Sequence, residues 1–299
     1  MNASLYISDQ SFVFNGVDTD IEVAQKIIDL NDLWKYLHGS EDLKRKNIFY
    51  IQPKNFLSTK ITKTLQICDL LEGKGDKATF RDTVNLFIAI LSKGTRLIQS
   101  STNEELQEYL QLRDEDSDCA LVVFNKLENF PKECKQILCN KCDWLEFQRA
   151  HIHDFPHDAQ YFIEESKWLF PDVVINGDTY DKLNNVYADH ARQIMKCMRY
   201  LNDDIRKELK EHNGDNISFM NKSKPYGMQA SYEGNHKKKD VFNLILNYGQ
   251  GQKQKIYCEP HLKYNTKDSN SSFSTLRVYF HMPAANDEKI FVGYICSHL

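Results

Sequence analysis

Hydrophobic and polar residues alternate through several blocks near the C-terminus, the period of a strand with one dry and one wet face. The clearest block is Lys255–Lys263, in which Ile256, Cys258 and Leu262 point one way and polar residues point the other. The pattern predicts four antiparallel strands, at about 240–248, 254–263, 273–281 and 289–296.

If these strands pair, their wet faces bring together groups that donate, accept and stabilise charge. Neighbouring strands place such side chains about 5–7 Å apart, close enough to surround one phosphate. The alternative without a catalytic role is a solvent-facing sheet with ordinary cross-strand ion pairs. We expect a candidate catalytic face made of Glu259, His261, Lys263, Arg277, Tyr279, His281 and His298.

A helical period dominates residues 178–212, where apolar residues recur in steps of three and four. Asp178 is placed to cap the start, and Asn213-Gly214 supplies a terminator. We expect a strut between regions or a homodimer contact. The stripe consists of Tyr180, Leu183, Tyr187, Ala191, Ile194, Met198, Leu201, Ile205 and Leu209.

The first 150 residues have the pattern of a mixed α/β module, expected to act as a sensor or to bind a partner. A hairpin is predicted from Leu5–Ile7 and Phe12–Phe14, and the irregular order of elements argues against a parallel doubly wound sheet. Neither a P-loop motif nor a GxGxxG motif is found. Helices are predicted at 18–37, 57–72, 77–93 and 102–112, and strands at 47–51 and 119–124.

The predicted fold class is α+β, in three regions. An α/β module covers 1–150, a helical region covers 151–219, and a basic antiparallel β domain covers 220–299. Helices within 131–170 and a strand at 172–175 precede the long helix. Asn, Ser, Gly and Lys dominate 218–239, which predicts a linker before the β domain.

The composition limits the class of protein. The chain has 299 residues, of which 41% are hydrophobic and 27% charged, values typical of globular proteins. We expect no membrane segment, because no apolar run approaches the roughly 18 residues that a span needs. The eight cysteines are scattered without a disulfide framework, so we expect a reducing, cytoplasmic location.

The overall charge of −4 hides an asymmetry. Residues 220–299 hold 11 Lys and Arg against 6 Asp and Glu, whereas residues 1–219 hold 27 against 36. A basic end suits contact with a phosphate backbone, RNA more than DNA, although a solvated surface with a chance skew gives the same numbers. The candidate nucleic-acid-binding residues are Lys237, Lys238, Lys239, Lys253 and Lys255.

The candidate face has the groups needed to cleave RNA without metal or cofactor. A base must deprotonate the 2′-hydroxyl, an acid must protonate the leaving 5′-oxygen, and cations must surround the phosphate. His261 and His281 are the expected base and acid. Arg277 is the expected phosphate clamp, since its planar fork matches two phosphate oxygens.

The motifs Glu-Pro-His-x-Lys (259–263), Leu-Arg-Val-Tyr-Phe (276–280) and Lys-Ile-Phe-Val-Gly-Tyr-Ile (289–295) resemble small toxin RNases of the RelE/HigB type. The resemblance covers about 60 of the 299 residues. It implies a curved antiparallel sheet and mRNA cleavage. It also implies charge-stabilising roles for Arg277, Tyr279 and His281, with Glu259 to Lys263 on the neighbouring strand.

Three metal-dependent alternatives stay open. The first is a set of thiols and imidazoles that suits zinc: Cys134, Cys139, Cys142, His151 and His153. Cysteines at this spacing also occur in the core of a helix, so we expect no structural metal there. His151, His153, Asp154 and His157 also have a spacing seen in metal hydrolases. Asp240 with Glu259 and Lys263 distantly follows the metal-dependent PD-(D/E)XK nuclease pattern.

The function expected from these residues is a cytoplasmic, metal-independent endoribonuclease acting in anti-phage defence or stress. A non-catalytic sensor or adaptor that binds nucleic acid or protein is the rival from another class. A metal-dependent nuclease is the third. No motif supports a serine or cysteine nucleophile.

Overall fold

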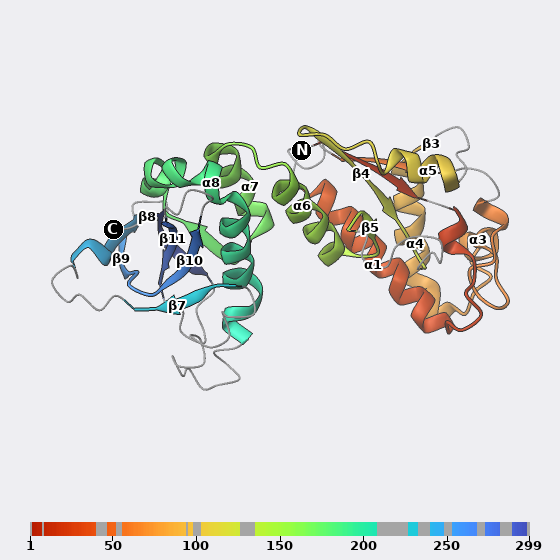
Figure 1. Ribbon diagram of the computed structural model, residues 1–299. Helices are drawn as coiled ribbons and strands as arrows, with labels where there is room; N and C mark the ends of the chain where they lie inside the picture. The colour runs from red at the N-terminus through yellow and green to blue at the C-terminus, as the bar shows by residue number, and fades with distance from the viewer. Residues whose placement is uncertain are drawn as a thin grey trace. The chain divides into compact units, whose positions relative to one another are not determined.

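The computed structural model describes residues 2–7, 9–39, 47–51, 56–93, 95–97, 103–125, 135–207, 227–232, 240–247, 253–267, 273–281 and 289–297. The chain divides into two compact units, Met1–His151 and Ile152–Leu299. Each contains its own five-stranded sheet (Figure 1).

The N-terminal unit is built on a parallel sheet with the strand order β3-β2-β1-β4-β5. Helices bury one face of this sheet through a core that includes Leu5, Val23, Phe87 and Phe147, and on the other face Tyr109 stacks on Tyr6. The strands are β1 (Asn2–Ile7), β2 (Asn47–Ile51), β3 (Thr95–Leu97), β4 (Ser117–Val122) and β5 (Ile137–Leu138). The helices are α1 (Asp20–His38), α3 (Ile67–Leu71), α4 (Lys77–Lys93), α5 (Asn103–Tyr109) and α6 (Lys141–Asp154).

The sheet order is that of a doubly wound fold, so the prediction against such a sheet was wrong. The predicted hairpin was also wrong, because Phe12 lies in a 3₁₀ turn, Asp9–Phe12, and β1 pairs only with β2 and β4 among the described strands. The helix expected at 57–72 begins only at Ile67. Before it, the Thr62 hydroxyl accepts hydrogen bonds from the backbone amides of residues 64 and 65 and so competes with a helical turn.

The C-terminal unit contains a second sheet in the order β6-β12-β11-β10-β7, antiparallel except for the β6–β12 pair. The α+β class and the antiparallel C-terminal sheet are therefore confirmed. The strands are β6 (Val173–Ile175), β7 (Gln229–Ser231), β10 (His261–Lys267), β11 (Phe273–Phe280) and β12 (Ile290–Cys296). The hairpin strands β8 (Asn243–Asn247) and β9 (Lys253–Tyr257) form a separate two-stranded sheet.

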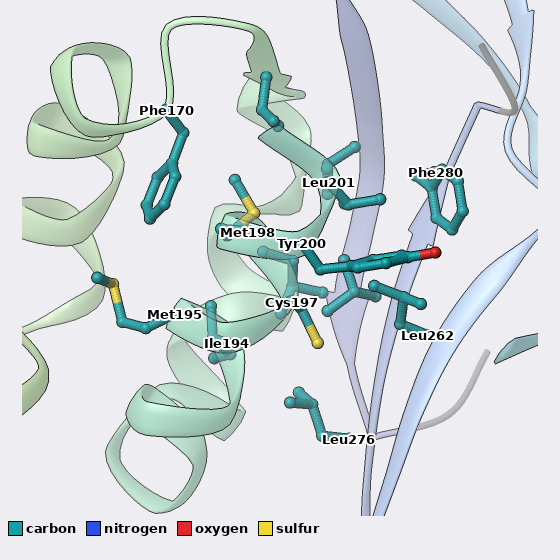
Figure 2. Packing of buried hydrophobic residues seen from close by; sticks show 14 of the residues in the cluster. Phe170, Ile194, Met195, Cys197, Met198, Tyr200, Leu201, Leu262, Leu276 and Phe280 are labelled. Atoms are coloured by element: carbon teal, nitrogen blue, oxygen red, sulfur yellow. The ribbon is translucent and has the colours of Figure 1, made fainter. Parts of the chain in front are cut away.

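Helix α8 (Tyr180–Arg199), continued by a π-helical turn at Tyr200–Asp204, covers one face of this sheet together with α7 (Ala159–Leu169) (Figure 1). Figure 2 shows the contact, with side chains of α8 and its π turn directed at strand residues. The core members labelled there include Ile194, Cys197, Met198, Leu201, Leu262, Leu276 and Phe280.

The stripe expected to form a strut or a dimer contact is therefore buried inside its own unit. Tyr180 is 37% exposed, and Leu209 lies outside the described residues. The helical region and the β domain, expected as separate regions, share one core. The physical reason is β6, which joins the sheet beside β12 and ties the two segments together.

The expected linker at 218–239 needs the same kind of correction. Gln229–Ser231 is strand β7, paired with β10 at the edge of the sheet, and the neighbouring Met228 is buried in the core. Among the helices that the structure describes, none is both long and apolar enough to cross a membrane.

Candidate active site

Strand register arranges polar residues in two rows on the sheet face opposite α8. Residues directly opposite one another on neighbouring strands share a face, and β7, β10, β11 and β12 run side by side (Figure 1). We call this surface the polar face. Its first row is Ser231, His261, Tyr279 and Tyr294, and its second row is Gln229, Lys263, Arg277 and Cys296.

The shared face of His261, Lys263, Arg277 and Tyr279 agrees with the alternation in the sequence, since His261 faces Tyr279 and Lys263 faces Arg277. These pairs come from segments about fifteen residues apart in the chain. An antiparallel register with a period of two makes the agreement possible, because a shift by one residue would turn every one of these side chains to the core.

The predicted strand 254–263 is interrupted, which moves Glu259 off the strand that carries His261. Strand β9 ends at Tyr257, and β10 begins at His261. Between them, the Cys258 amide still donates to the carbonyl of Phe242 in the hairpin, whereas Pro260 has no amide and its carbonyl accepts from Phe280. The chain thus passes from the two-stranded sheet to the five-stranded one at this proline.

The polar face is half covered, contrary to the expectation of a wet face. Phe242 packs on Tyr279 with ring centroids 5.5 Å apart, and Leu244 and Cys258 close on Gly293. A Cβ at Gly293 would lie 2.4 Å from Leu244 Cδ1, so glycine permits this approach. As a result Tyr279 is 0% exposed.

We call the other half, towards β7, the open half, because it is the less covered one among the described residues. Gln229 is exposed, and Ser231, Lys263 and Arg277 are half-buried. His261 lies where the two halves meet and is 3% exposed. Among the described residues, the polar face is therefore most exposed at its β7 edge.

Hydrogen bonds connect the first row to its surroundings. The Arg277 Nη1 donates to the Tyr279 hydroxyl at 3.0 Å, and the His261 ring lies 4.9 Å from the Tyr279 ring. His261 Nε2 is 3.0 Å from the Ser231 hydroxyl oxygen. The buried Tyr279 thus contacts two of the candidate groups: its hydroxyl accepts the hydrogen bond from Arg277, and its ring packs against that of His261.

Glu259 stays close to the face although it has left the strand. Its carboxylate accepts a hydrogen bond from the Tyr257 hydroxyl at 2.8 Å, and its backbone carbonyl lies 3.4 Å from His261 Nδ1. Burial, followed by the hydrogen bond to Glu259 and its charge, raises the pKa of Tyr257 to about 12. Burial and then the charge of Glu259 also raise the pKa of Tyr232.

At neutral pH these tyrosines are therefore neutral hydrogen-bond donors. Burial raises the pKa of the Cys296 thiol to about 11, and the nearby charges of Lys182 and Arg277 oppose that shift. Cys296 is accordingly a neutral thiol.

The remaining predicted residues are dispersed or undescribed. A register shift between Tyr279 and Phe280 interrupts the alternation before His281, whose ring lies 6.4 Å from that of Phe291. Lys255 is exposed on β9, and Lys253 belongs to the same strand, but its side chain lies outside the described part. Outside the described residues altogether are His298, Lys237, Lys238 and Lys239.

The described residues do not assemble a metal site. Within them, no group of three or more His, Cys, Asp and Glu is placed to hold an ion. His151 is fully buried, with Nδ1 3.1 Å from the Asp118 carboxylate, whereas Cys142 is exposed. Cys139 is half-buried and donates its amide to Asp143. His153 has its Nδ1 3.2 Å from Asp154.

Four members of the polar face are not among the site residues predicted from the sequence: Gln229, Ser231, Tyr294 and Cys296. Gln229 and Ser231 belong to strand β7. Their strand has only three residues, too few for an alternating pattern to stand out from a polar segment. The signal available in the sequence was the apolar–polar–apolar order of Met228, Gln229 and Ala230, which needs the register with β10 to be interpreted.

Comparison of the chain with models of known protein families, with curated proteins and with solved structures gives no match.

Proposed function

We propose that this chain is a nucleic-acid-acting effector, a metal-independent endoribonuclease whose site is the open half of the polar face. The observation that carries the proposal is the position of Lys263 directly opposite Arg277. Like charges opposite each other on neighbouring strands destabilise a sheet. An anion held between the two side chains would offset that cost, and a phosphate of a nucleic acid backbone is such an anion.

The neighbouring row supplies the group for proton transfer. His261 stands next to Lys263 along β10, about 7 Å away by the strand repeat. In this proposal His261 accepts the proton of the attacking hydroxyl and then gives it to the leaving oxygen, and Arg277 and Lys263 stabilise charge on the phosphate oxygens. Tyr279 is buried, so its role is to position Arg277 and His261 and not to touch the substrate.

The direct test is cleavage of labelled RNA by the purified full-length chain, with and without EDTA. We expect cleavage that survives EDTA, since the proposed chemistry needs no metal. Cleavage abolished by EDTA and restored by a divalent ion would favour the metal-dependent alternative. Replacement of Lys263 by Ala should weaken RNA binding and flatten its salt dependence by about one counterion. The matched control is Lys196→Ala, which removes an exposed charge from α8 on the other side of the sheet.

A second candidate, binding without cleavage, is favoured by the burial of His261 and Tyr279. Such a protein would be a sensor or adaptor that holds nucleic acid on Lys263 and Arg277. His261→Gln separates the two: an endoribonuclease loses cleavage by roughly 100-fold or more and keeps its affinity. An adaptor shows no cleavage to lose.

A further inference from the structure

Ser231 and His261 form a side-chain pair that no motif in the sequence indicates. The two residues face each other across β7 and β10, and Ser231 Oγ lies 3.0 Å from His261 Nε2. Ser231 closes the edge strand and is half-buried at the open half of the polar face. A substrate can approach this hydroxyl from the side that the hairpin leaves uncovered.

The other ring nitrogen sets the direction of this hydrogen bond. His261 Nδ1 lies 3.4 Å from the backbone carbonyl of Glu259, at the long end of the hydrogen-bonding range. A carbonyl oxygen only accepts, so Nδ1 carries the proton and Nε2 of the neutral ring presents its lone pair. The Ser231 hydroxyl therefore donates to Nε2.

The result is the sequence of contacts found around activated serines: hydroxyl, imidazole base, and an acceptor that orients the base. Packing fixes the imidazole further, since His261 is nearly fully buried and its ring lies against that of Tyr279. Here a backbone carbonyl takes the place that a carboxylate has in other serine sites.

Charges in the second row indicate the substrate class. Lys263 follows His261 by two residues on the same face, and Arg277 stands opposite Lys263. A carboxylic ester would need amide donors at its oxyanion, whereas a pair of cations suits the oxygens of a phosphodiester. We propose that Ser231 is the nucleophile of this site and attacks the phosphorus of a phosphodiester. The substrate class rests on the function proposed above, but the activation of Ser231 does not.

The reaction balances without any further reactant except water. The Ser231 Oγ–P bond forms as its proton passes to His261 Nε2, and the P–O bond to the leaving group breaks as that oxygen takes the proton from Nε2. Water then bonds to phosphorus, gives its proton to Nε2, and the P–Oγ bond breaks as Oγ recovers that proton. The products are a hydroxyl end and a phosphomonoester end.

The first test is chemical and independent of any nucleic acid. The full chain is treated with an alkyl fluorophosphonate, which forms an Oγ–P bond with loss of fluoride, and the adduct is located by peptide mass spectrometry. We expect Ser231 to react at least roughly 100-fold faster than the exposed Ser297, and His261→Gln to remove that advantage. A Ser231 that labels no faster than Ser297, or equally well in His261→Gln, would overturn the proposal.

Two control variants distinguish a structural role of Ser231 from a nucleophilic one. Ser297→Ala should leave labelling of Ser231 unchanged, and Ser231→Thr should keep the hydrogen bond while labelling more slowly. If the pair only joins the strands, His261→Gln shifts the melting temperature while Ser231 of the unaltered chain stays unreactive.

The second test uses a labelled oligonucleotide with a single 2′-deoxy linkage at the cleaved position. Cleavage by a serine nucleophile persists, because the substrate's own 2′-hydroxyl is not needed. Cleavage of RNA that stops at the 2′-deoxy linkage leaves the proposed endoribonuclease in place and overturns Ser231 as its nucleophile. Labelling of Ser231 without cleavage of any nucleic acid contradicts the proposed function and leaves the activated serine standing.

Discussion

The two sheets differ in which charged side chains lie beside their buried or half-buried charged residues. In the N-terminal sheet, the fully buried Asp118 accepts hydrogen bonds from Arg113 at 2.9 Å and Gln136 at 3.2 Å, and His151 lies 3.1 Å away. In the C-terminal sheet, Lys263 and Arg277 face each other with the same sign. In the first arrangement opposite charges compensate one another, whereas in the second two like charges stand opposite each other, where we propose that an anion binds.

The charges of neighbouring side chains distinguish a structural polar cluster from a candidate site better than the types of residue do. Histidine, arginine and a carboxylate occur in both places, and the sequence offered His151 as a possible zinc ligand. Its ring is already engaged, since Nε2 lies 3.3 Å from the carbonyl of Glu115 and Nδ1 faces Asp118. The signs and partners of the neighbours, and not the residue types, make the polar face the better candidate site.

The largest effect on stability should come from opening the closed cluster. Asp118→Ala removes the buried carboxylate that pairs with Arg113 and lies beside His151, and should cost about 3–5 kcal/mol in the free energy of unfolding. Urea denaturation measures this cost. The exposed Asp116, just before β4, is the control, and Asp116→Ala should stay within about 0.5 kcal/mol. A cost for Asp118→Ala below about 1 kcal/mol would contradict a structural role.

A comparable loss is expected on the helix side of the C-terminal sheet. Leu201 is fully buried in the core shown in Figure 2, so Leu201→Ala should cost about 2–5 kcal/mol of unfolding free energy. RNA affinity of the folded fraction, measured by filter binding well below the melting temperature, should not change. Reduced affinity there would mean that the two faces of this sheet are coupled.

On the polar face the charge comparison itself can be tested. Arg277→Lys keeps the sign but loses the planar fork and the hydrogen bond to Tyr279, and we expect cleavage to fall roughly 100-fold. Thermal unfolding should change little, since the residue is half-buried and its charge is retained. If cleavage is unaffected while stability falls, Arg277 belongs with the structural group.

The smallest expected effect compares two thiols, one from each unit. Burial raises the pKa of Cys296 to about 11, so near pH 8 it is almost entirely the unreactive thiol. Cys142 is exposed. Iodoacetamide at pH 8 should therefore modify Cys142 at least roughly tenfold faster than Cys296, and the rate at Cys296 should rise as the pH approaches 11. In urea the difference should vanish. Equal rates in the folded chain would show that the cover over the polar face opens readily.

Local pattern was sufficient for most individual elements. Helix α4 has the predicted bounds, 77–93, and β11 and β12 fall within one residue of the predicted strands. The alternation of Leu276, Arg277 and Val278 gave the correct faces because the period of a strand is a property of the backbone itself. The sequence therefore determined that His261, Lys263 and Tyr279 share a face with Arg277.

Tertiary structure decided the neighbours of those elements. The parallel order of the N-terminal sheet, the entry of β6 and β7 into the second sheet, and the cover of Phe242 on Tyr279 all join segments far apart in the chain. Hydrophobic burial is non-directional, so the pattern says that a residue is buried without saying what covers it. For the same reason, the pairing of Ser231 with His261 became visible only when β7 was placed beside β10.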